Sequence, residues 1–207
     1  MKILIACEYS GIVREAFKNK GHDAWSCDIL PTEIEGQHIQ GDVLEVLGQN
    51  WDMMIAHPPC TYLTVTANKW LKDQQERKSG ALVGAERRKA REEAIEFFMK
   101  LINANIPKIV IENPVGCMSS IYRKPCQIIQ PMEFGHPEPK KTCLWIKGLS
   151  PLKATHQGIK PEYTLTKSGK RMATWYYYAE NVKGSNRSKV RSKTFQGIAD
   201  AMAEQWG

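Results

Sequence analysis

The sequence predicts an α/β fold built on an open sheet of mostly parallel strands. Short apolar runs alternate with stretches of helical periodicity along most of the chain, which is the pattern of strands joined by crossover helices. A length of 207 residues suits one domain. The composition, 42% hydrophobic and 25% charged, is that of a globular protein rather than a disordered or fibrous one.

Each element follows from the local pattern. Four apolar runs predict the central strands, at residues 2–6, 24–27, 53–56 and 108–111. The spacing of apolar residues predicts a helix from residue 12 that closes at Gly21, a short helix after Gly41, a long helix at 85–104 and a last one at 195–205. Two β-like runs lie at 127–130 and 143–146.

Polar residues follow the predicted strands at the points where the strands end. They are residues 8–11, Asp28, Asp42, residues 58–60 and residues 112–113. In open α/β sheets, ligands bind outside the carboxyl ends of the strands. We therefore expect these residues to form one site.

The first part of this site has the features of a nucleoside pocket. Asp28 ends the second predicted strand, where a carboxylate can accept hydrogen bonds from ribose hydroxyls, and a further acid, Asp42, stands in Gly-Asp-Val. The turn after the first strand contains Gly11 but has neither the dinucleotide glycine pattern nor a P-loop, so a nucleoside without a phosphate chain fits better. Taken singly, each acid is equally well explained as a cap or turn residue.

Cys60 and Glu112 form the second part of the site. Two prolines precede Cys60, and their rings fix the backbone and leave no amide to donate. A carboxyl group whose pKa is raised in a pocket can donate a proton to a ring nitrogen. Each residue alone also fits a buried thiol or an ordinary turn. Together, beside a nucleoside pocket, a thiolate and a carboxylic acid indicate covalent catalysis on a heteroaromatic ring.

The positive charge of the chain is concentrated in one segment. Residues 153–193 contain ten Lys or Arg and two acids, whereas the rest of the chain carries 19 basic and 20 acidic residues. Tyr163 and the aromatic run 175–178 lie in the same segment. Aromatic rings among cations favour a nucleic-acid surface over a plain solvated loop.

Several classes of protein are disfavoured. No apolar run reaches the roughly 20 residues that cross a bilayer, and the N-terminal stretch lacks a signal-peptide cleavage pattern, so we expect a cytoplasmic protein. The six cysteines have no C-x-x-C spacing, which disfavours a disulfide framework and a structural zinc site. A zinc deaminase lacks support because the H-x-E and P-C-x-x-C motifs are missing, and we expect no metal.

The ordered set of motifs resembles that of the DNA cytosine-5 methyltransferases, a family of class I S-adenosylmethionine-dependent enzymes. The motifs are Tyr9-Ser10-Gly11, Asp28, Gly41-Asp42-Val43, the strand and loop 52–60 that end in Pro58-Pro59-Cys60, Glu112-Asn113-Pro114, the stretch 134–142 and the C-terminal stretch 194–206. They cover most of the chain, and small phage- or prophage-type members are most similar.

The resemblance implies a Rossmann-like class I methyltransferase sheet, mostly parallel with helices on both faces, and a short β-rich basic C-terminal segment. The cofactor-binding and catalytic core would be residues 1–148, the nucleic-acid-contacting segment 149–193, and a helix packing back on the core 194–207. The residues implied in binding S-adenosylmethionine are Glu8, Tyr9, Ser10, Gly11, Asp28, Ile29, Asp42, Val43, His57 and Pro58. Those implied in catalysis are Cys60, Glu112 and Asn113.

The implied activity is methyl transfer to C5 of cytosine through a covalent Cys60 intermediate. The base would be flipped out of double-stranded DNA, and the polar stretch 61–84 is expected to be a mobile loop that closes on the DNA, although a plain surface loop fits equally well. The residues expected to contact nucleic acid are Lys69, Lys140, Trp175, Tyr177, Arg187 and Arg191. We expect a monomer in a bacterial or phage-infected host.

The chain departs from the family pattern in two places. Residues 138–142 read Glu-Pro-Lys-Lys-Thr where the family has Gln-x-Arg-x-Arg, so Lys140, Arg187 or Arg191 would replace the arginine near the target base. Lysine cannot supply the planar, bidentate fork of arginine. Segment 149–193 is short for a target-recognition domain, so we expect recognition of a short sequence, or recognition supplied by a partner.

Two other functions stay open. A catalytically silent module that binds S-adenosylmethionine or nucleic acid fits the altered stretch 138–142, whereas the intact Cys60 and Glu112 argue against it. A methyltransferase of RNA or free nucleotides is the other alternative, and the clustered positive charge favours a polymer over a nucleotide.

Overall fold

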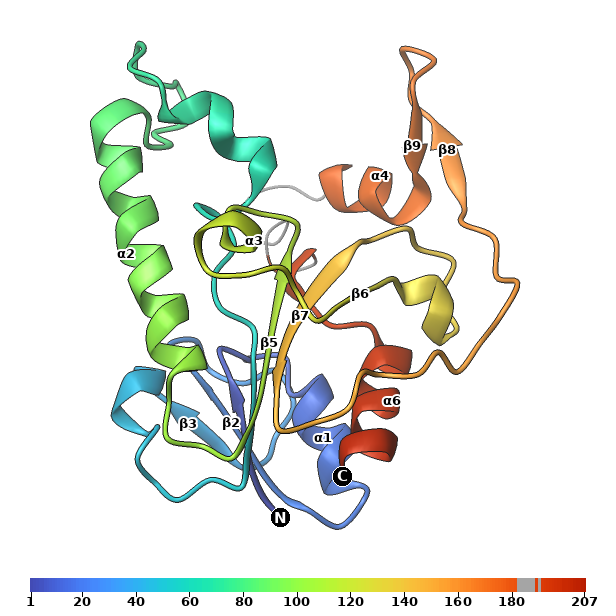
Figure 1. Ribbon diagram of the computed structural model, residues 1–207. Helices are drawn as coiled ribbons and strands as arrows, with labels where there is room; N and C mark the ends of the chain where they lie inside the picture. The colour runs from blue at the N-terminus through green and yellow to red at the C-terminus, as the bar shows by residue number, and fades with distance from the viewer. Residues whose placement is uncertain (182–188, 190) are drawn as a thin grey trace.

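A seven-stranded sheet forms the centre of the molecule (Figure 1). The computed structural model describes residues 1–181, 189 and 191–207. The strand order is β3-β2-β1-β4-β5-β7-β6; β1 to β5 pair in parallel, and β7 runs antiparallel to both neighbours. The strands are β1 Lys2–Ala6, β2 Asp23–Asp28, β3 His38–Gln40, β4 Met53–Ala56, β5 Lys108–Pro114, β6 Gln127–Ile129 and β7 Thr142–Lys147. This is the expected Rossmann-like sheet, which is mostly parallel.

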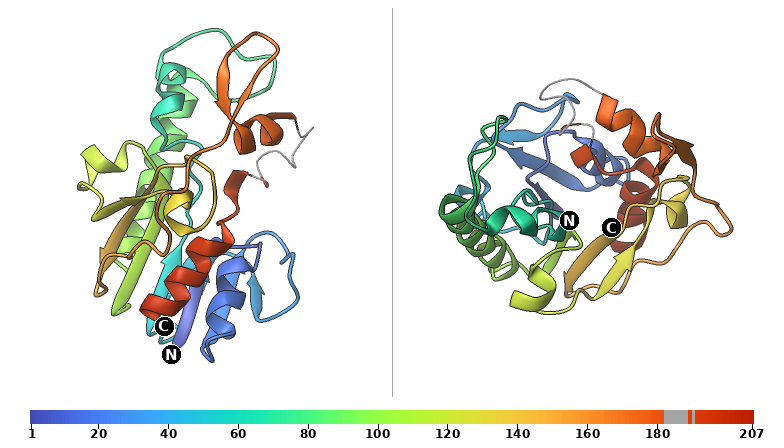
Figure 2. Two further views of the ribbon diagram at one scale, coloured as in Figure 1. Left: turned by 90° about the vertical axis from the view of Figure 1, so that its right-hand side faces the viewer. Right: turned by 90° about the horizontal axis from the view of Figure 1, so that it is seen from above.

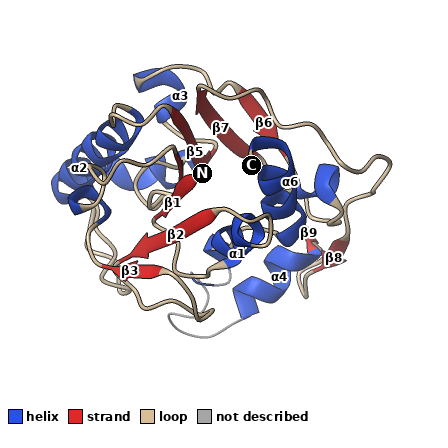
Figure 3. Cartoon of the chain, turned by 90° about the horizontal axis from the view of Figure 1, so that it is seen from below, coloured by secondary structure: helices blue, strands red, loops and turns tan. Residues whose placement is uncertain are grey.

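Helices cover both faces of the sheet (Figure 3). The α-helices are α1 Ile12–Lys18, α2 Gly84–Ile102, α3 Met118–Ile121, α4 Thr174–Asn181 and α6 Gln196–Trp206, and the 3-10 helices are η1 Val43–Glu45, η2 Val65–Leu71 and η3 Pro131–Phe134. Helices α1 and α6 lie side by side on one face, and α2 packs on the other. In the described part of the chain, no helix has the length and apolar character needed to cross a membrane.

The two hydrophobic clusters follow from the alternation of side chains along buried strands. Ile3 and Ile5 of β1 belong to the cluster under α1 and α6. Leu4 and Ala6 belong to the cluster under α2, which also contains Trp145. Because β1 is buried on both faces, it reads as a continuous apolar run, as expected for a parallel sheet.

Two arms rise beyond the carboxyl ends of the parallel strands (Figure 1 and Figure 2). One arm is the stretch between β4 and α2, which contains η2. The other is the hairpin of β8 (Tyr163–Leu165) and β9 (Arg171–Ala173), with α4 after it. The basic segment thus contains short strands, as expected, but its aromatic run 175–178 lies in a helix. Strand β3 and helices η2, α3 and α4 were not predicted from the sequence.

Gly197 allows the C-terminal helix to approach η3 closely. A Cβ atom at position 197 would lie 1.8 Å from the carbonyl oxygen of Phe134. The amide of Gly197 also donates to His136 Nε2 at 2.9 Å. The first turn of α6 therefore has no room for a side chain at this position.

We expect Gly197→Ala to lower the free energy of unfolding by about 2 kcal/mol, because α6 must move away from η3. Urea denaturation of the variant and the wild type measures the difference. Gly48→Ala is the matched control, since a Cβ atom at position 48 meets nothing within 4 Å. Equal unfolding midpoints for Gly197→Ala and Gly48→Ala would show that the helix accommodates the methyl group.

Candidate active site

The parallel register brings three segments together at one edge of the sheet. Ala6 pairs with Ala56, and Ala56 pairs with Ile111. The residues that follow these three positions are Cys7, His57 and Glu112. They therefore lie at the carboxyl ends of adjacent strands, where the polar motifs were expected to meet.

The loop that carries Cys60 is held by backbone and side-chain hydrogen bonds. Asn113, only 2% exposed, donates from Nδ2 to the carbonyl of Pro58 at 2.9 Å. The amides of Leu63 and Thr64 donate to the carbonyl of Cys60. These contacts connect β5 to the Pro-Pro-Cys loop, so Asn113 acts in this structure on the position of the loop.

Glu112 accepts a hydrogen bond from His57, whose Nδ1 lies 3.2 Å from Oε2. Burial raises the pKa of the Glu112 carboxyl, but the His57 hydrogen bond and the positive charge of Lys140 outweigh it, so the pKa lies below its ordinary value. The expectation of a raised pKa at Glu112 is thus wrong for this state of the molecule. The sequence pattern did not reveal these two neighbours of Glu112.

The pKa of the Cys60 thiol is shifted in the opposite direction, above its ordinary value. Burial raises the pKa of its thiol, and the negative charge of Glu112 raises it further. The positive charges of Lys140 and Arg191 lower it, but by less. The resting pair is therefore a thiol and a carboxylate, rather than the thiolate and carboxylic acid expected from the motifs.

The loop after β1 is built around the carboxylate of Glu8. Its Oε1 accepts hydrogen bonds from the amide of Val13 at 2.7 Å and from Ser10 Oγ at 3.1 Å, and its Oε2 accepts from the amide of Arg14 at 3.2 Å. A carboxylate at the start of a helix satisfies amides that have no partner within the helix. Glu8 thus holds the loop, in which Gly11 has a left-handed backbone with φ of 75°.

The other expected cofactor residues lie beyond β2 and β3. Asp28 Oδ1 accepts from the amide of Leu30 at 2.9 Å, and burial raises the pKa of its carboxyl. Asp42 Oδ1 accepts from the amide of Leu44 at 2.9 Å and caps η1. Ile29 is 74% exposed beside Asp28, whereas Val43 is 4% exposed and packs in the core. Val43 therefore offers backbone rather than side chain to a ligand.

A small cavity lies between the β1 loop and the C-terminal segment. Its volume is about 40 Å³, and it is lined by Cys7, Glu8, Tyr9, Ser10, His57, Ser192, Lys193 and Thr194. The hydroxyl of Tyr9 donates to the carbonyl of Lys189 at 3.0 Å and lies 3.1 Å from Ser192 Oγ. A cavity of this volume holds about three water molecules, so a nucleoside fits only if residues 192–194 move away.

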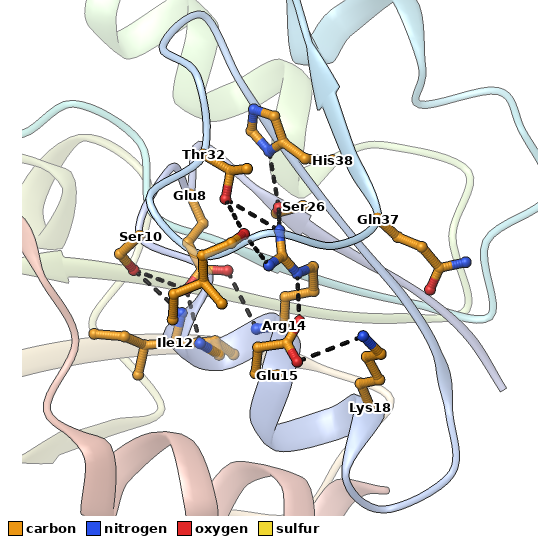
Figure 4. A network of polar contacts seen from close by, with 12 residues as sticks. Glu8, Ser10, Ile12, Arg14, Glu15, Lys18, Ser26, Thr32, Gln37 and His38 are labelled. Carbon is orange, nitrogen blue, oxygen red and sulfur yellow. Dashed lines mark hydrogen bonds and ion pairs between the residues drawn. The ribbon is translucent and has the colours of Figure 1, made fainter.

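Arg14 is a fully buried cation that the sequence analysis did not single out (Figure 4). Its guanidinium donates to Ser26 Oγ, Thr32 Oγ1, the carbonyl of Ile34 and Glu15 Oε1, at distances from 2.6 to 3.2 Å. Cβ atoms at Gly11 and Gly36 would lie within 3 Å of its Nη2. Arg14 therefore connects α1 to β2, which ends at Asp28, and to the loop after it, which begins at Ile29.

The residues expected to contact nucleic acid fall into two groups. Lys69 stacks over the ring of Trp70 on the arm that contains η2. The second group contains Lys140, Trp175 and Arg191. Lys140 donates to the carbonyl of Arg191, and Trp175 packs edge-on against Phe195. The guanidinium of Arg191 lies over Tyr176, and Tyr177 packs against Tyr178. Arg187 lies outside the described residues.

The comparisons with known proteins find structural neighbours only. No protein-family model matches the chain, and no curated protein matches it. Among solved structures, the chain is similar to a candidate DNA modification methyltransferase encoded within a prophage of E. coli, with a TM-score of 0.42 and 14% identity. It is also similar to a mutant of DNMT2 from Spodoptera frugiperda, with a TM-score of 0.41 and 16% identity.

Both alignments cover 77% of this chain, but 50% and 54% of the neighbours. The chain thus spans about half the length of these proteins. The strand order, rather than this distant similarity, carries the conclusion about the fold.

Proposed function

We propose that the chain transfers a methyl group from S-adenosylmethionine to C5 of cytosine in DNA, with Cys60 as the nucleophile. The observation that carries the proposal is the contact between two motif segments: His57, three residues before Cys60, bonds to Glu112 of the adjacent strand β5 and lines a cavity with Tyr9 and Ser10. The negative charge of Glu112 raises the pKa of the Cys60 thiol. A nucleophile next to an acid is the arrangement that covalent catalysis on a ring requires.

The residues around the strand ends fit the cofactor by their chemistry. Asp28 and Asp42 supply carboxylate oxygens for hydroxyl and amino donors, and the exposed Ile29 supplies an apolar surface for a flat ring. The cavity lined by Tyr9, Ser10 and His57 would receive the methionine part. The cofactor, when bound, supplies an electrophilic methyl group on a sulfonium.

The resting protonation states give a balanced first step. The Cys60 sulfur forms a bond to C6 of cytosine while its proton passes to the Glu112 carboxylate, and Glu112 delivers a proton to N3 of the ring. The ring then carries a nucleophilic C5, which takes the methyl group. A base removes the C5 proton, the sulfur leaves C6, and the N3 proton returns through Glu112 to the thiolate.

DNA is the polymer that the charge distribution and the family resemblance favour. The concentration of cations in residues 153–193 provides contacts for phosphates. Lys140 lies close enough to Cys60 and Glu112 to influence the pKa of both, so we assign it the cation position next to the target base. A base reaches this edge of the sheet only after it is flipped out of a duplex, between the two arms.

A second candidate function has one observation in its favour. Residues 192–194 line the small cavity and Tyr9 is bonded to Ser192, as expected for a silent module whose cofactor site has closed. The preserved contacts of Asn113 and His57 around Cys60 and Glu112 favour the enzyme instead. A catalytically silent domain has no need of this arrangement.

A methyl-transfer assay tests the proposal. We expect purified protein to move tritiated methyl groups from S-adenosylmethionine to mixed-sequence DNA, and bisulfite sequencing of a plasmid from an expressing host to reveal modified cytosines. DNA with 5-fluorocytosine should trap a covalent adduct on Cys60, because the C5 fluorine blocks elimination. Cofactor binding without transfer to DNA would identify the silent module, and transfer to RNA or free cytidine alone would identify the third alternative.

A further inference from the structure

His57 lies between the small cavity and the Glu112 carboxyl. Its Nδ1 lies 3.2 Å from Glu112 Oε2, and its side chain is 9% exposed. The contact follows from the strand register, because Ala56 pairs with Ile111 and the next residue of each strand is His57 or Glu112. His57 is therefore held against the carboxyl by the sheet itself.

The second ring nitrogen of His57 has no such contact. Within the described residues, Nε2 is buried and has no hydrogen-bond partner. Buried polar atoms in proteins are nearly always hydrogen-bonded. Because His57 lines the cavity with Tyr9, Ser10 and Ser192, a molecule bound in this cavity is the partner available to Nε2.

The ionised state of Glu112 decides which nitrogen of His57 carries hydrogen. A carboxylate only accepts hydrogen bonds, so Nδ1 is the donor, and in a neutral imidazole Nε2 is then an acceptor. A neutral His57 therefore accepts a hydrogen bond at Nε2 from a donor on the bound molecule. The lining of the cavity does not include Asp28 and Asp42, the carboxylates proposed for the hydroxyl and amino donors of the cofactor, so the cavity corresponds to the methionine end of the ligand.

We propose that His57 is a positioning residue that joins the cofactor pocket to Glu112: Nδ1 donates to the carboxylate, and Nε2 accepts a hydrogen bond from the ammonium group of S-adenosylmethionine. The inference rests on the proposed function, since it names the cofactor of the same site. It adds a direct link between occupancy of the pocket and the position of the catalytic carboxyl.

The groups around Glu112 determine how its pKa changes when the hydrogen bond from His57 is lost. His57 faces it from the loop after β4, Lys140 and Thr142 face it from the β7 side, and the thiols of Cys60 and Cys143 interact with its charge. Burial raises the pKa of Glu112, and the His57 hydrogen bond opposes this. Without that bond, the pKa of Glu112 rises even though Lys140 and Thr142 remain.

Two substitutions test the two ring nitrogens of His57 separately. His57→Asn keeps an amide donor at the place of Nδ1 and has no group at the place of Nε2. His57→Gln places an amide oxygen or nitrogen near Nε2 but removes the Nδ1 donor. The readouts are calorimetric Kd values for S-adenosylmethionine and for adenosine, which lacks the ammonium, and the carboxyl titration of Glu112 in ¹³C NMR spectra of glutamate-labelled protein.

We expect His57→Asn to weaken binding of S-adenosylmethionine about tenfold and to leave adenosine binding unchanged, because one hydrogen bond to a charged group is lost. We expect His57→Gln to change the Kd by less than about threefold and to move the Glu112 titration to higher pH. His156→Gln is the matched control, since His156 lies beside Gly135 and Thr155, away from the cavity, and should change neither quantity.

Other outcomes overturn the inference. If both variants lost equal affinity for S-adenosylmethionine and for adenosine, His57 would only support the fold of the loop. If the Glu112 titration did not move in His57→Gln, the proposed role of the Nδ1 hydrogen bond would be wrong. If the proposed function is wrong, the wild type itself will not bind S-adenosylmethionine. The proposed hydrogen bond from the cofactor to Nε2 would then be wrong as well. The NMR titration of Glu112 tests the hydrogen bond from His57 Nδ1 in either case.

Discussion

Replacing Cys60 with serine is expected to abolish methyl transfer while S-adenosylmethionine still binds. A serine hydroxyl is a far weaker nucleophile than a thiolate, so the covalent step is lost and the rate should fall by about 10⁴-fold or more. The cofactor contacts are assigned to Asp28 at the end of β2 and to Asp42 before η1, away from the Cys60 loop, and should persist. Transfer of tritiated methyl groups to DNA measures the rate, and calorimetry measures the binding.

Cys126→Ser is the matched control for this variant. Cys126 is an exposed free cysteine beside β6, so the same chemical change should leave transfer at the wild-type rate. If Cys60→Ser retained activity, the covalent scheme would be wrong, and a direct transfer without addition to the ring would have to replace it. If both variants were inactive, general damage to the protein would explain the loss.

The second large effect is expected at Arg14. Arg14→Met keeps an apolar stem of similar length but leaves Ser26, Thr32 and the carbonyl of Ile34 without their guanidinium donor. We expect a loss of about 3 kcal/mol in the free energy of unfolding, because these buried or half-buried polar groups lose a charged partner. Urea denaturation, followed by circular dichroism, measures this loss.

The same variant should weaken cofactor binding, because Arg14 bonds to Ser26 of β2, the strand that ends at Asp28, and to the loop after it (Figure 4). Lys18→Met provides the control on the same helix. Lys18 forms only a surface ion pair with Glu15, so its loss should cost less than about 1 kcal/mol. Equal stability of the two variants would show that the Arg14 network contributes little beyond what its desolvation costs.

The main strands and helices could be predicted from the sequence because their signals are local. Each apolar run of β1, β4 and β5 is buried on both faces, and each run appears as a strand. The short strand His38–Gln40 is only three residues long and partly exposed, so it carries no apolar run. Helix α4 was missed because an aromatic run is equally typical of strands.

The site could be predicted in part. The polar motifs do follow the strand ends, since the carboxyl ends of parallel strands meet at one edge. The protonation states could not be predicted, because they depend on Lys140 and His57, which lie far from Glu112 in the sequence. Arg14 had one usable signal: it precedes the buried Phe17 by three residues, which places it on the inner side of α1.

The sequence by itself determined the sheet, the order of its motifs and the residues that stand at the strand ends, because apolar periodicity and the position of a residue after a strand are local properties. Only the tertiary structure decided that His57 bonds to Glu112, that Cys60 rests as a thiol, and that residues 192–194 line the cavity beside Tyr9. These features arise from contacts between segments far apart in the chain. Strand register and burial set those contacts, and neither is written in a local pattern.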